Sequence, residues 1–327
     1  MSLTYYLETH STDPAYNLAL EEYVLKNRLQ GNYLILWQNR NAVIVGRNQN
    51  TQAEINREFV ERHGIKVIRR NTGGGAVYHD LGNLNYSFIT DAAEQSTDTF
   101  TRPVVQALRS LGLDAEATGR NDILVSGRKV SGTAQYRIAG RILHHGTLLF
   151  DSNADMIAGS LNPDPTKFQS KAVQSVRSRV GNIRAHLSKD MDIAQFWAYL
   201  KTALAEDGIA PISLTDGELA EVEKLKAEKY DTWQWNYGTG PKFGTMLRRR
   251  WSGGSLQIHL NIVHGTIESA QIFGDFLSVS PTEPLIEALK GCAYREDAIC
   301  KALTDVDLDG CLGSITKEEF LSTILDK

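Results

Sequence analysis

The sequence predicts a mixed α and β protein in two parts, a large α/β domain over residues 1–243 and a small α+β domain over residues 244–327. In the first part, short runs of β-branched and aromatic residues alternate with segments of helical periodicity. A stretch rich in Trp and Gly, residues 230–243, is predicted to be the linker. Beyond it, apolar and polar residues alternate on both sides of residues 264–265, as in a β-hairpin.

The first helix is predicted to begin just after Asp13, whose side chain suits an N-cap, with Pro14 in the first turn. Leu18 and Leu25 recur at helical spacing and predict a buried apolar stripe. Glu22 falls on the same stripe, and we interpret it as a residue at the margin of that stripe.

The other elements follow from composition and periodicity. Strands are predicted at residues 33–37, 42–46, 65–69, 84–89, 122–125 and 143–150. Helices are predicted at residues 101–112, 189–206, 214–229, 282–291 and 295–305.

The composition is that of an ordinary globular protein, with 42% hydrophobic and 23% charged residues. The net charge of -4 argues against a general nucleic-acid binder. Neither a secretory signal nor an apolar run of about 20 residues is present, so we expect no membrane association. The cysteines Cys292, Cys300 and Cys311 do not have zinc-site spacing and suggest a reducing compartment. We therefore expect a cytoplasmic protein, and a monomer.

The stretch "RRNTGGGAVYHD", residues 69–80, contains three consecutive glycines, which are costly to order. No Lys follows them as a Walker A loop requires, and the run leads into "AVYHD" and not into a Rossmann helix. What remains is a strand, a glycine turn and another strand, in which successive backbone N–H groups can bind an anion. Arg69 and Arg70 are predicted to stand at its entrance and to favour a phosphate or nucleotide site over a purely structural turn.

A second polar constellation is "GRNDILVSGRKVSGTAQ", residues 119–135. Asn121 and Asp122 begin a predicted strand, and Lys129 follows a turn. An amide and a carboxylate beside a lysine could hold a metal-bound phosphate. The alternative is a surface hairpin with solvated charges.

Two adjacent histidines occur in "HHGTLLF", residues 144–150. Because neighbouring side chains of a strand face opposite sides, only one of His144 and His145 can face a given pocket.

The stretch "DVDLDGCLGSITKEEF", residues 305–320, is similar to a calcium-binding loop. The twelfth position, however, holds Thr316 where a bidentate Glu is required. We interpret it as an Asp/Gly turn before a helix, with Thr316 and Glu319 as a capping box.

Together these motifs resemble the lipoate–protein ligase A family over nearly the whole chain. The resemblance is carried by "DPAYNLALEE", "AVIVGRNQN", "RRNTGGGAVYHDLGNLNYSF", "GRNDILVSGRKVSGTAQ", "HHGTLLF", "SVRSRVGNI", "WQWNYG" and "GDF". It implies an α+β fold, with a class II aminoacyl-tRNA-synthetase-like catalytic domain, shared with biotin ligases, and a small α+β C-terminal domain.

The resemblance also implies a two-step reaction. Lipoate and ATP, with Mg²⁺, give lipoyl-AMP and pyrophosphate. A lysine of an apo lipoyl domain then takes the lipoyl group. The implied acceptors are the acyltransferase subunits of 2-oxo acid dehydrogenases and the glycine cleavage H protein.

Site residues follow by matching motif positions. Lys129 corresponds to the catalytic lysine, which would offset the repulsion between the lipoate carboxylate and the α-phosphate. The implied nucleotide site consists of Arg70, Gly75, Ala76, Val77, Tyr78, Asn121, Asp122 and Lys129. The implied lipoate site consists of Leu18, Arg70, Gly74, His79, Lys129 and His145. Asp122 is also the implied magnesium ligand. One departure, Asn71–Thr72 in place of serines, is not expected to alter the chemistry.

Three rival functions remain open. An octanoyl- or lipoyl-transferase that forms a thioester needs a nucleophilic cysteine, and residues 1–291 contain none. A biotin ligase fits the glycine loop less well. A catalytically silent sensor of lipoate or nucleotide would not need the Lys129 motif.

Overall fold

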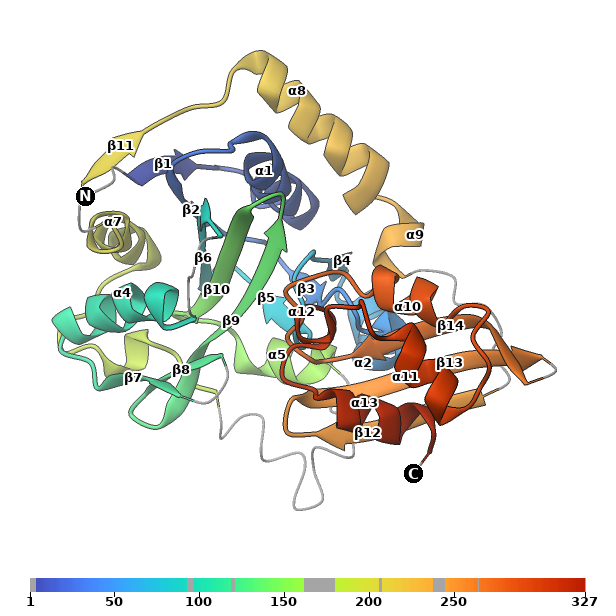
Figure 1. Ribbon diagram of the computed structural model, residues 1–327. Helices are drawn as coiled ribbons and strands as arrows, with labels where there is room; N and C mark the ends of the chain where they lie inside the picture. Colours follow the sequence, from blue (N-terminus) through green and yellow to red (C-terminus); the bar gives the residue numbers. More distant parts are fainter. Residues whose placement is uncertain are drawn as a thin grey trace.

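A large mixed sheet is the frame of the molecule (Figure 1). The computed structural model describes residues 4–92, 97–118, 121–161, 180–205, 208–237, 245–263 and 265–326. Eight strands lie in the order β11 (Ile209–Pro211), β1 (Thr4–Glu8), β2 (Asn32–Trp37), β6 (Asn83–Asp91), β10 (Arg141–Leu149), β9 (Arg128–Ile138), β8 (Asp122–Val125) and β7 (Ala115–Thr118). β1 is parallel to both of its neighbours, and the remaining pairs are antiparallel.

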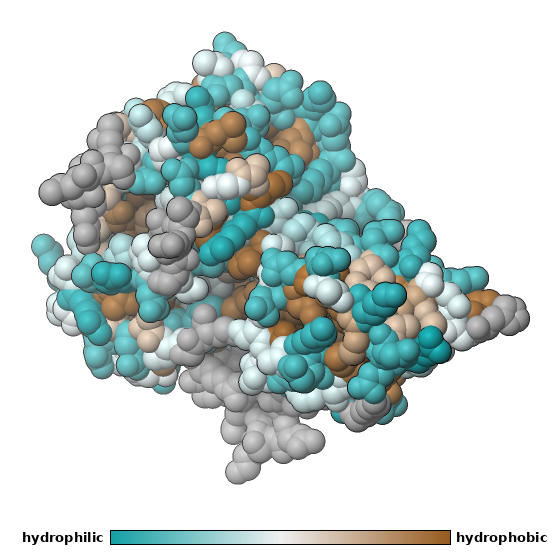
Figure 2. Space-filling view, in the orientation of Figure 1, coloured by the Kyte–Doolittle hydropathy of each residue, from teal (hydrophilic) through white to brown (hydrophobic). Residues whose placement is uncertain are grey.

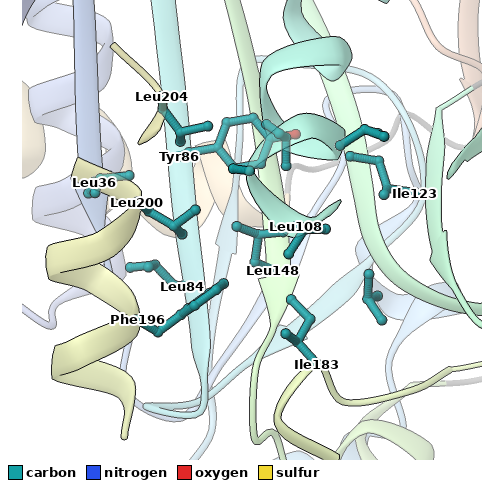
Figure 3. Close-up of a cluster of buried hydrophobic side chains, with 14 of the residues drawn as sticks. Leu36, Leu84, Tyr86, Leu108, Ile123, Leu148, Ile183, Phe196, Leu200 and Leu204 are labelled. Carbon is teal, nitrogen blue, oxygen red and sulfur yellow. The ribbon is translucent and has the colours of Figure 1, made fainter. Parts of the chain in front are cut away.

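Helices cover both faces of this sheet. On one face, α4 (Thr97–Ser110) and α7 (Ile193–Ala203) pack over an apolar cluster to which β2 contributes Leu34 and Leu36 (Figure 3). On the other face lie α1 (Pro14–Asn27), α8 (Asp216–Leu225) and a π-helical turn at Lys226–Tyr230. Because side chains alternate along a strand, Ile35 and Trp37 of β2 face this second cluster.

A small second sheet carries the glycine run. Its strands lie in the order β4 (Lys66–Arg69), β3 (Ala42–Val45) and β5 (Val77–His79). The helices beside it are α2 (Thr51–Glu54), α3 (Arg57–Arg62) and α5 (Ala154–Ser160). The glycines lie between β4 and β5, so the predicted order of strand, glycine turn and strand is confirmed.

The C-terminal residues form a unit with its own core. Its sheet contains β12 (Thr245–Trp251), β13 (Gly254–Val263) and β14 (Thr266–Gly274), and its helices are α10 (Glu283–Leu289), α11 (Glu296–Ala302), α12 (Leu308–Leu312) and α13 (Lys317–Ile324). β13 and β14 pair antiparallel, which confirms the predicted hairpin, although His264 lies outside the described residues. The predicted boundary at residues 243–244 also falls outside the described ranges.

Two predicted helix N-caps are confirmed. Asp13 accepts a hydrogen bond from the Ala15 N–H at the start of α1. The capping box of Thr316 and Glu319 is present at the start of α13. The Asp/Gly turn predicted before it is instead the short helix α12, which Asp307 caps.

The sequence analysis missed the strands β1, β7, β9, β11 and β12, of which β9 is the longest. β9 contains "RKVSGTAQYRI", which has no apolar run, and its strand form is decided by pairing with β8 and β10 on its two sides. The predicted helix at 101–112 begins earlier, at Thr97, with Pro103 inside it. The predicted helix at 189–206 is restricted to α7, because the capping box of Asp192 and Gln195 sets its start.

The predicted linker is wrong for its first residues. Within 230–243, Trp233–Asn236 forms the short helix α9, followed by Tyr237. Trp235 donates its indole N–H to the Arg69 carbonyl at 2.8 Å, so this segment is fastened to the small sheet.

None of the helices in the described ranges is long and apolar enough to cross a membrane. On the face shown in Figure 2, hydrophobic residues form small groups among hydrophilic ones.

Candidate active site

The predicted site residues meet at one cavity of about 350 Å³. It lies where the large sheet, the glycine loop (residues 70–76) and the C-terminal unit come together. All predicted site residues except Tyr78 line it, namely Leu18, Arg70, Gly74, Gly75, Ala76, Val77, His79, Asn121, Asp122, Lys129 and His145. Tyr78 buries its ring in the core of the small sheet, so only its main chain could serve a ligand.

The strand register explains how distant residues share this cavity. One residue from each of five neighbouring strands lies in a row across the sheet. In the order β2, β6, β10, β9 and β8, these residues are Trp37, Asn85, Thr147, Gly132 and Asp122. All five line the cavity. Four inter-strand spacings of ~4.8 Å separate the two ends by about 19 Å. The cavity therefore has an apolar end at Trp37 and a charged end at Asp122 and Lys129.

Each of the three glycines meets a different constraint. A Cβ on Gly73 would lie 2.7 Å from the Phe276 carbonyl oxygen. Glycine at this position therefore leaves room for the main chain of the C-terminal unit. Gly74 has a φ of +91°, which favours glycine, and its N–H donates to the Phe276 carbonyl at 3.0 Å. A Cβ on Gly75 would have nothing within 4 Å, so the main chain there is open to a ligand.

Arg70 holds the glycine loop from inside. Its guanidinium donates to the carbonyls of Ile44, Gly73 and Gly75 and to the Thr72 hydroxyl. Burial, partly offset by Glu21, lowers the pKa of Arg70 to about 10, so it remains a cation at neutral pH. Arg70 thus sets the shape of the loop and adds positive charge beneath it.

Arg69 does not stand at the entrance as predicted. Its guanidinium points away from Arg70 and donates to main-chain carbonyls of residues 46, 47, 49, 235 and 236 and to the Thr51 hydroxyl. Consecutive residues at the end of a strand face opposite sides, so the two arginines cannot both serve the cavity.

His145 faces the cavity and is held by a buried network. Its Nδ1 donates to the Glu21 carboxylate at 2.9 Å, and its Nε2 lies 2.8 Å from the Thr72 hydroxyl. Ser87 donates to the same carboxylate and accepts a hydrogen bond from the Trp37 indole N–H. His145 thus connects Glu21 of α1 with Thr72 of the glycine loop.

His144 faces the opposite side, as strand alternation predicted. It is fully buried and stacks on Phe100, with ring centroids 4.8 Å apart. Burial lowers its pKa to about 3, so the ring is neutral and structural.

His79 lies at the apolar end, beside Trp37. Asn39 accepts from Asn17 through its carbonyl oxygen and therefore turns its amide N–H toward His79 Nδ1, at 3.1 Å. Burial, with Arg70 and His145 as lesser causes, lowers the pKa of His79 to about 3. His79 is thus neutral, with its proton on Nε2, and Nε2 has no partner among the described residues.

Lys129 reaches the cavity because of a β-bulge. The register between β8 and β9 shifts so that Lys129 faces Leu124, and Val130 becomes the extra residue. Lys129 Nζ lies 2.6 Å from Asp122 Oδ1 and passes over Gly132. Neighbouring Asn121 uses its amide to donate to the Thr133 carbonyl at 3.0 Å, which fastens the strand ends.

Comparisons with known proteins identify the family. The family described as lipoyl protein ligase A/B catalytic domain matches residues 13–205, and that described as bacterial lipoate protein ligase C-terminus matches residues 240–324. The chain belongs to the lipoate–protein ligase family. The family, enzyme class and fold class predicted from its motifs are thereby confirmed.

Two curated relatives match nearly end to end. Lipoate–protein ligase 1 of Staphylococcus aureus is 44% identical over 315 residues, covering 95% of this chain and 96% of that protein. Lipoate-protein ligase LplJ of Bacillus subtilis is 43% identical over 320 residues, covering 95% and 97%.

Solved structures of lipoate ligases share the fold. P. falciparum LipL1, solved in complex with lipoate, has a TM-score of 0.80 at 25% identity, covering 99% of this chain and 98% of that one. A lipoate-protein ligase A bound with ATP has a TM-score of 0.63 at 28% identity, covering 72% and 98%.

This lipoate–protein ligase family member has few metal-ligating side chains at its cavity. The described residues contain no cluster of three or more His, Cys, Asp or Glu. Asp122 and Asp275 both line the cavity. Mg²⁺ commonly binds through one or two carboxylates and substrate phosphates, so these residues fit an ion held chiefly by a nucleotide.

Several cavity residues of this family member were not predicted. Trp37, Ile44, Asn85 and Gly132 lie within strands that the sequence did not relate to one another. Asp275 belongs to the "GDF" stretch, which did signal it, although without a role. Glu22 is not a stripe margin as predicted, because it is 2% exposed and is paired with Lys229.

Proposed function

We propose that this protein is an ATP-dependent lipoate–protein ligase that makes lipoyl-AMP and transfers the lipoyl group to a lysine of a lipoyl domain. The observation that carries this proposal is a single cavity with the Lys129–Asp122 pair at one end and Leu18, Trp37 and His79 toward the other, lined also by the glycine loop. Lipoate is an aliphatic carboxylate, and such a cavity can bury its tail and leave its carboxylate beside a cation.

The first step joins lipoate to the nucleotide. A lipoate carboxylate oxygen attacks the α-phosphorus of ATP, and the bond from that phosphorus to the bridging oxygen breaks to release pyrophosphate. Lys129 Nζ lies between the two anions, offsets their repulsion and stabilises the charge that develops. The open main chain at Gly75 and the adjoining residues, with Arg70 beneath, hold the adenylate.

Mg²⁺ would supply positive charge to the phosphates when bound. Asp122 is the carboxylate that would hold it, in place of or together with its pairing to Lys129.

The second step moves the lipoyl group. The neutral amine of an acceptor lysine attacks the carbonyl carbon of lipoyl-AMP, and the carbon–oxygen bond to AMP breaks with its electron pair leaving on AMP. The nitrogen gives up one proton to solvent as the amide forms. The proposed acceptors are apo lipoyl domains of 2-oxo acid dehydrogenase acyltransferases and the glycine cleavage H protein. A Thermoplasma acidophilum relative is described as a bi-partite lipoate protein ligase with its E2 lipoyl domain, which supports an acceptor of this kind.

The C-terminal unit, which we propose as a domain beginning near residue 244, has a role in the first step. It touches the glycine loop through Phe276 and the cavity through Asp275 and Leu277. Covering the cavity excludes water from a reactive mixed anhydride, whereas transfer requires access for a folded acceptor. We therefore infer that this unit covers the site for activation and moves aside for transfer.

The test is mass spectrometry of a purified apo lipoyl domain after incubation with the protein, lipoate and ATP. The expected result is the mass gain of one lipoyl group on the acceptor lysine, with AMP and pyrophosphate formed. A mass gain without ATP, or none with ATP and magnesium present, would contradict the proposal.

A further inference from the structure

Glu22 is the centre of a buried polar cluster that the reaction itself does not use. The cluster consists of Glu22 on α1, Asn71 in the glycine loop, and Lys229 and Tyr230 in the π-helical turn. Glu22, Asn71 and Tyr230 are all at most 5% exposed. These residues come from three separate parts of the chain, so the cluster ties together elements that sequence does not connect.

Every polar atom of the Asn71 side chain is engaged. Its amide nitrogen donates to Glu22 Oε2 at 2.9 Å and to the Tyr230 hydroxyl oxygen at 2.7 Å. Its carbonyl oxygen accepts from Lys229 Nζ at 2.7 Å. Three partners hold this side chain in one position and thereby restrain the main chain that carries it.

Lys229 is a partly buried cation. Its ammonium lies 2.7 Å from Glu22 Oε2 and 4.1 Å from the centroid of a Trp235 ring. Burial would raise the pKa of Glu22, but Lys229 and Asn71 lower it to about 2. Burial lowers the pKa of Lys229 from its usual value, an effect that Glu22 opposes. Glu22 is therefore a carboxylate at neutral pH and attracts the Lys229 ammonium.

The cluster acts on the residue next to Arg70. Arg69, on the other side of Arg70, is hydrogen-bonded to Trp235 and Asn236, which follow Lys229 and Tyr230 closely in the chain. Arg70 donates hydrogen bonds to the carbonyls of Gly73 and Gly75. Its neighbours on both sides in the sequence are thus held by residues 229–236.

We propose that Asn71 and Lys229, joined by Glu22, are positioning residues that hold the glycine loop in the shape that receives the nucleotide. This inference rests on the proposed function. At the lipoate end of the cavity, Trp37 donates to Ser87 and His79 lies beside Asn39, and neither of these partners belongs to the cluster. The cluster is therefore expected to act more strongly on nucleotide binding than on lipoate binding, since the implied lipoate site includes only Arg70 and Gly74 of the glycine loop.

Glu22 offers a matched control, because it pairs with two lysines. Lys229 bonds to Oε2 and also to Asn71, whereas Lys26 pairs with Oε1 at 2.5 Å and is 46% exposed. Lys229→Met and Lys26→Met each remove one cation from Glu22, but only the first releases the loop.

The experiment measures dissociation constants of the full-length variants for ATP and for lipoate by calorimetry. Lys229→Met is expected to weaken ATP binding by about tenfold, the equivalent of one good buried hydrogen bond to a charged group. Lipoate binding should change less than about twofold, and Lys26→Met should leave both constants near wild type. Equal effects of the two lysine variants on ATP, or equal loss of ATP and lipoate binding in Lys229→Met, would overturn the inference.

Asn71→Ser provides a second route if Lys229→Met does not fold. It is expected to weaken ATP binding alone, and the double variant with Lys229→Met should be no weaker than the worse single variant, because both changes break one unit. Additive losses would refute the shared role. A wild-type protein that binds lipoate but not ATP would instead overturn the proposed function, and this inference with it.

Discussion

The Lys129 ammonium lies 2.6 Å from Asp122 Oδ1 and above Gly132, where an added Cβ would come within 3.3 Å of Nζ. Asp122 and Gly132 are themselves cross-strand partners in β8 and β9. The lysine that we assign to adenylation is therefore placed by three local features: the bulge at Val130, the partner carboxylate and the missing side chain at 132.

Lys129→Ala is expected to abolish lipoate-dependent ATP–pyrophosphate exchange while the protein folds normally. The side chain is 38% exposed and makes one ion pair, so its loss should change the free energy of unfolding by less than about 1 kcal/mol. Lys129→Arg should not restore exchange, because a planar guanidinium does not replace a compact ammonium. Near wild-type exchange in the alanine variant would show that the assignment is wrong.

Gly132→Ala should slow activation by displacing the Lys129 ammonium. The expected loss is about tenfold or more in kcat for exchange, since misplacement of a catalytic group by a fraction of an ångström is costly. Gly217→Ala on α8 is the control, because a Cβ there meets nothing within 4 Å. If both glycine variants retain full activity, Gly132 has no role in placing the lysine.

Gly75→Val should weaken nucleotide binding in a folded protein. A Cβ on Gly75 meets nothing within the protein, so the added bulk would collide with the nucleotide and not with the fold. Gly74→Val should lose stability as well, because its φ of +91° strains a branched side chain. Equilibrium binding of ATP and thermal unfolding separate the two effects, and unchanged ATP affinity in Gly75→Val would leave the loop a structural turn.

Removal of residues 244–327 should impair lipoate activation and spare transfer from supplied lipoyl-AMP. The physical reason is that Phe276 and Leu277 lie against the glycine loop and cavity, whereas the Lys129 end belongs to the large sheet. Both half-reactions can be assayed on the truncated protein once its folding is verified by circular dichroism. Intact activation with lost transfer would instead make the C-terminal unit an acceptor-docking module.

The stability of the protein should fall steeply below pH 6.5. His79 and His144 have folded-state pKa values near 3, whereas an unfolded histidine protonates near its usual value of 6.5. Between those limits the unfolded state binds more protons, so stability rises with pH and is lost as pH falls from 6.5 toward 3. Each histidine contributes roughly 1.4 kcal/mol per pH unit within this window.

Urea unfolding at several values of pH between 7 and 4 measures this dependence. His144→Gln removes one of the two histidines. It should therefore reduce the slope of the free energy of unfolding against pH by the contribution of that histidine. An unchanged slope would show that His144 titrates in the folded protein.

The sequence by itself determined the family, the glycine loop, and the residues of the cavity that lie within short motifs. Arg70, His79, Asp122 and Lys129 were found because each stands at a fixed offset inside a continuous stretch. The same local signals identified the helix starts at Asp13 and Thr316, where a cap and its partner are two or three residues apart.

Only the tertiary structure decided which of two neighbouring residues serves the cavity and which supports the fold. Arg69 and Arg70 carry the same charge, but one fastens the segment before the C-terminal unit and the other shapes the loop. Glu22 fits an apolar stripe on periodicity alone, yet it is buried as a charge because Lys229 and Asn71 meet it from other parts of the chain.

The same reason explains the missed members of the cavity. Trp37, Asn85, Thr147 and Gly132 became neighbours through strand register, which is set by pairing across the sheet and not by spacing along the chain. Local sequence specifies the turns, caps and motif chemistry, because those interactions span a few residues. The long-range partners of a buried charge or a cross-strand pair are specified only when packing brings the distant segments together.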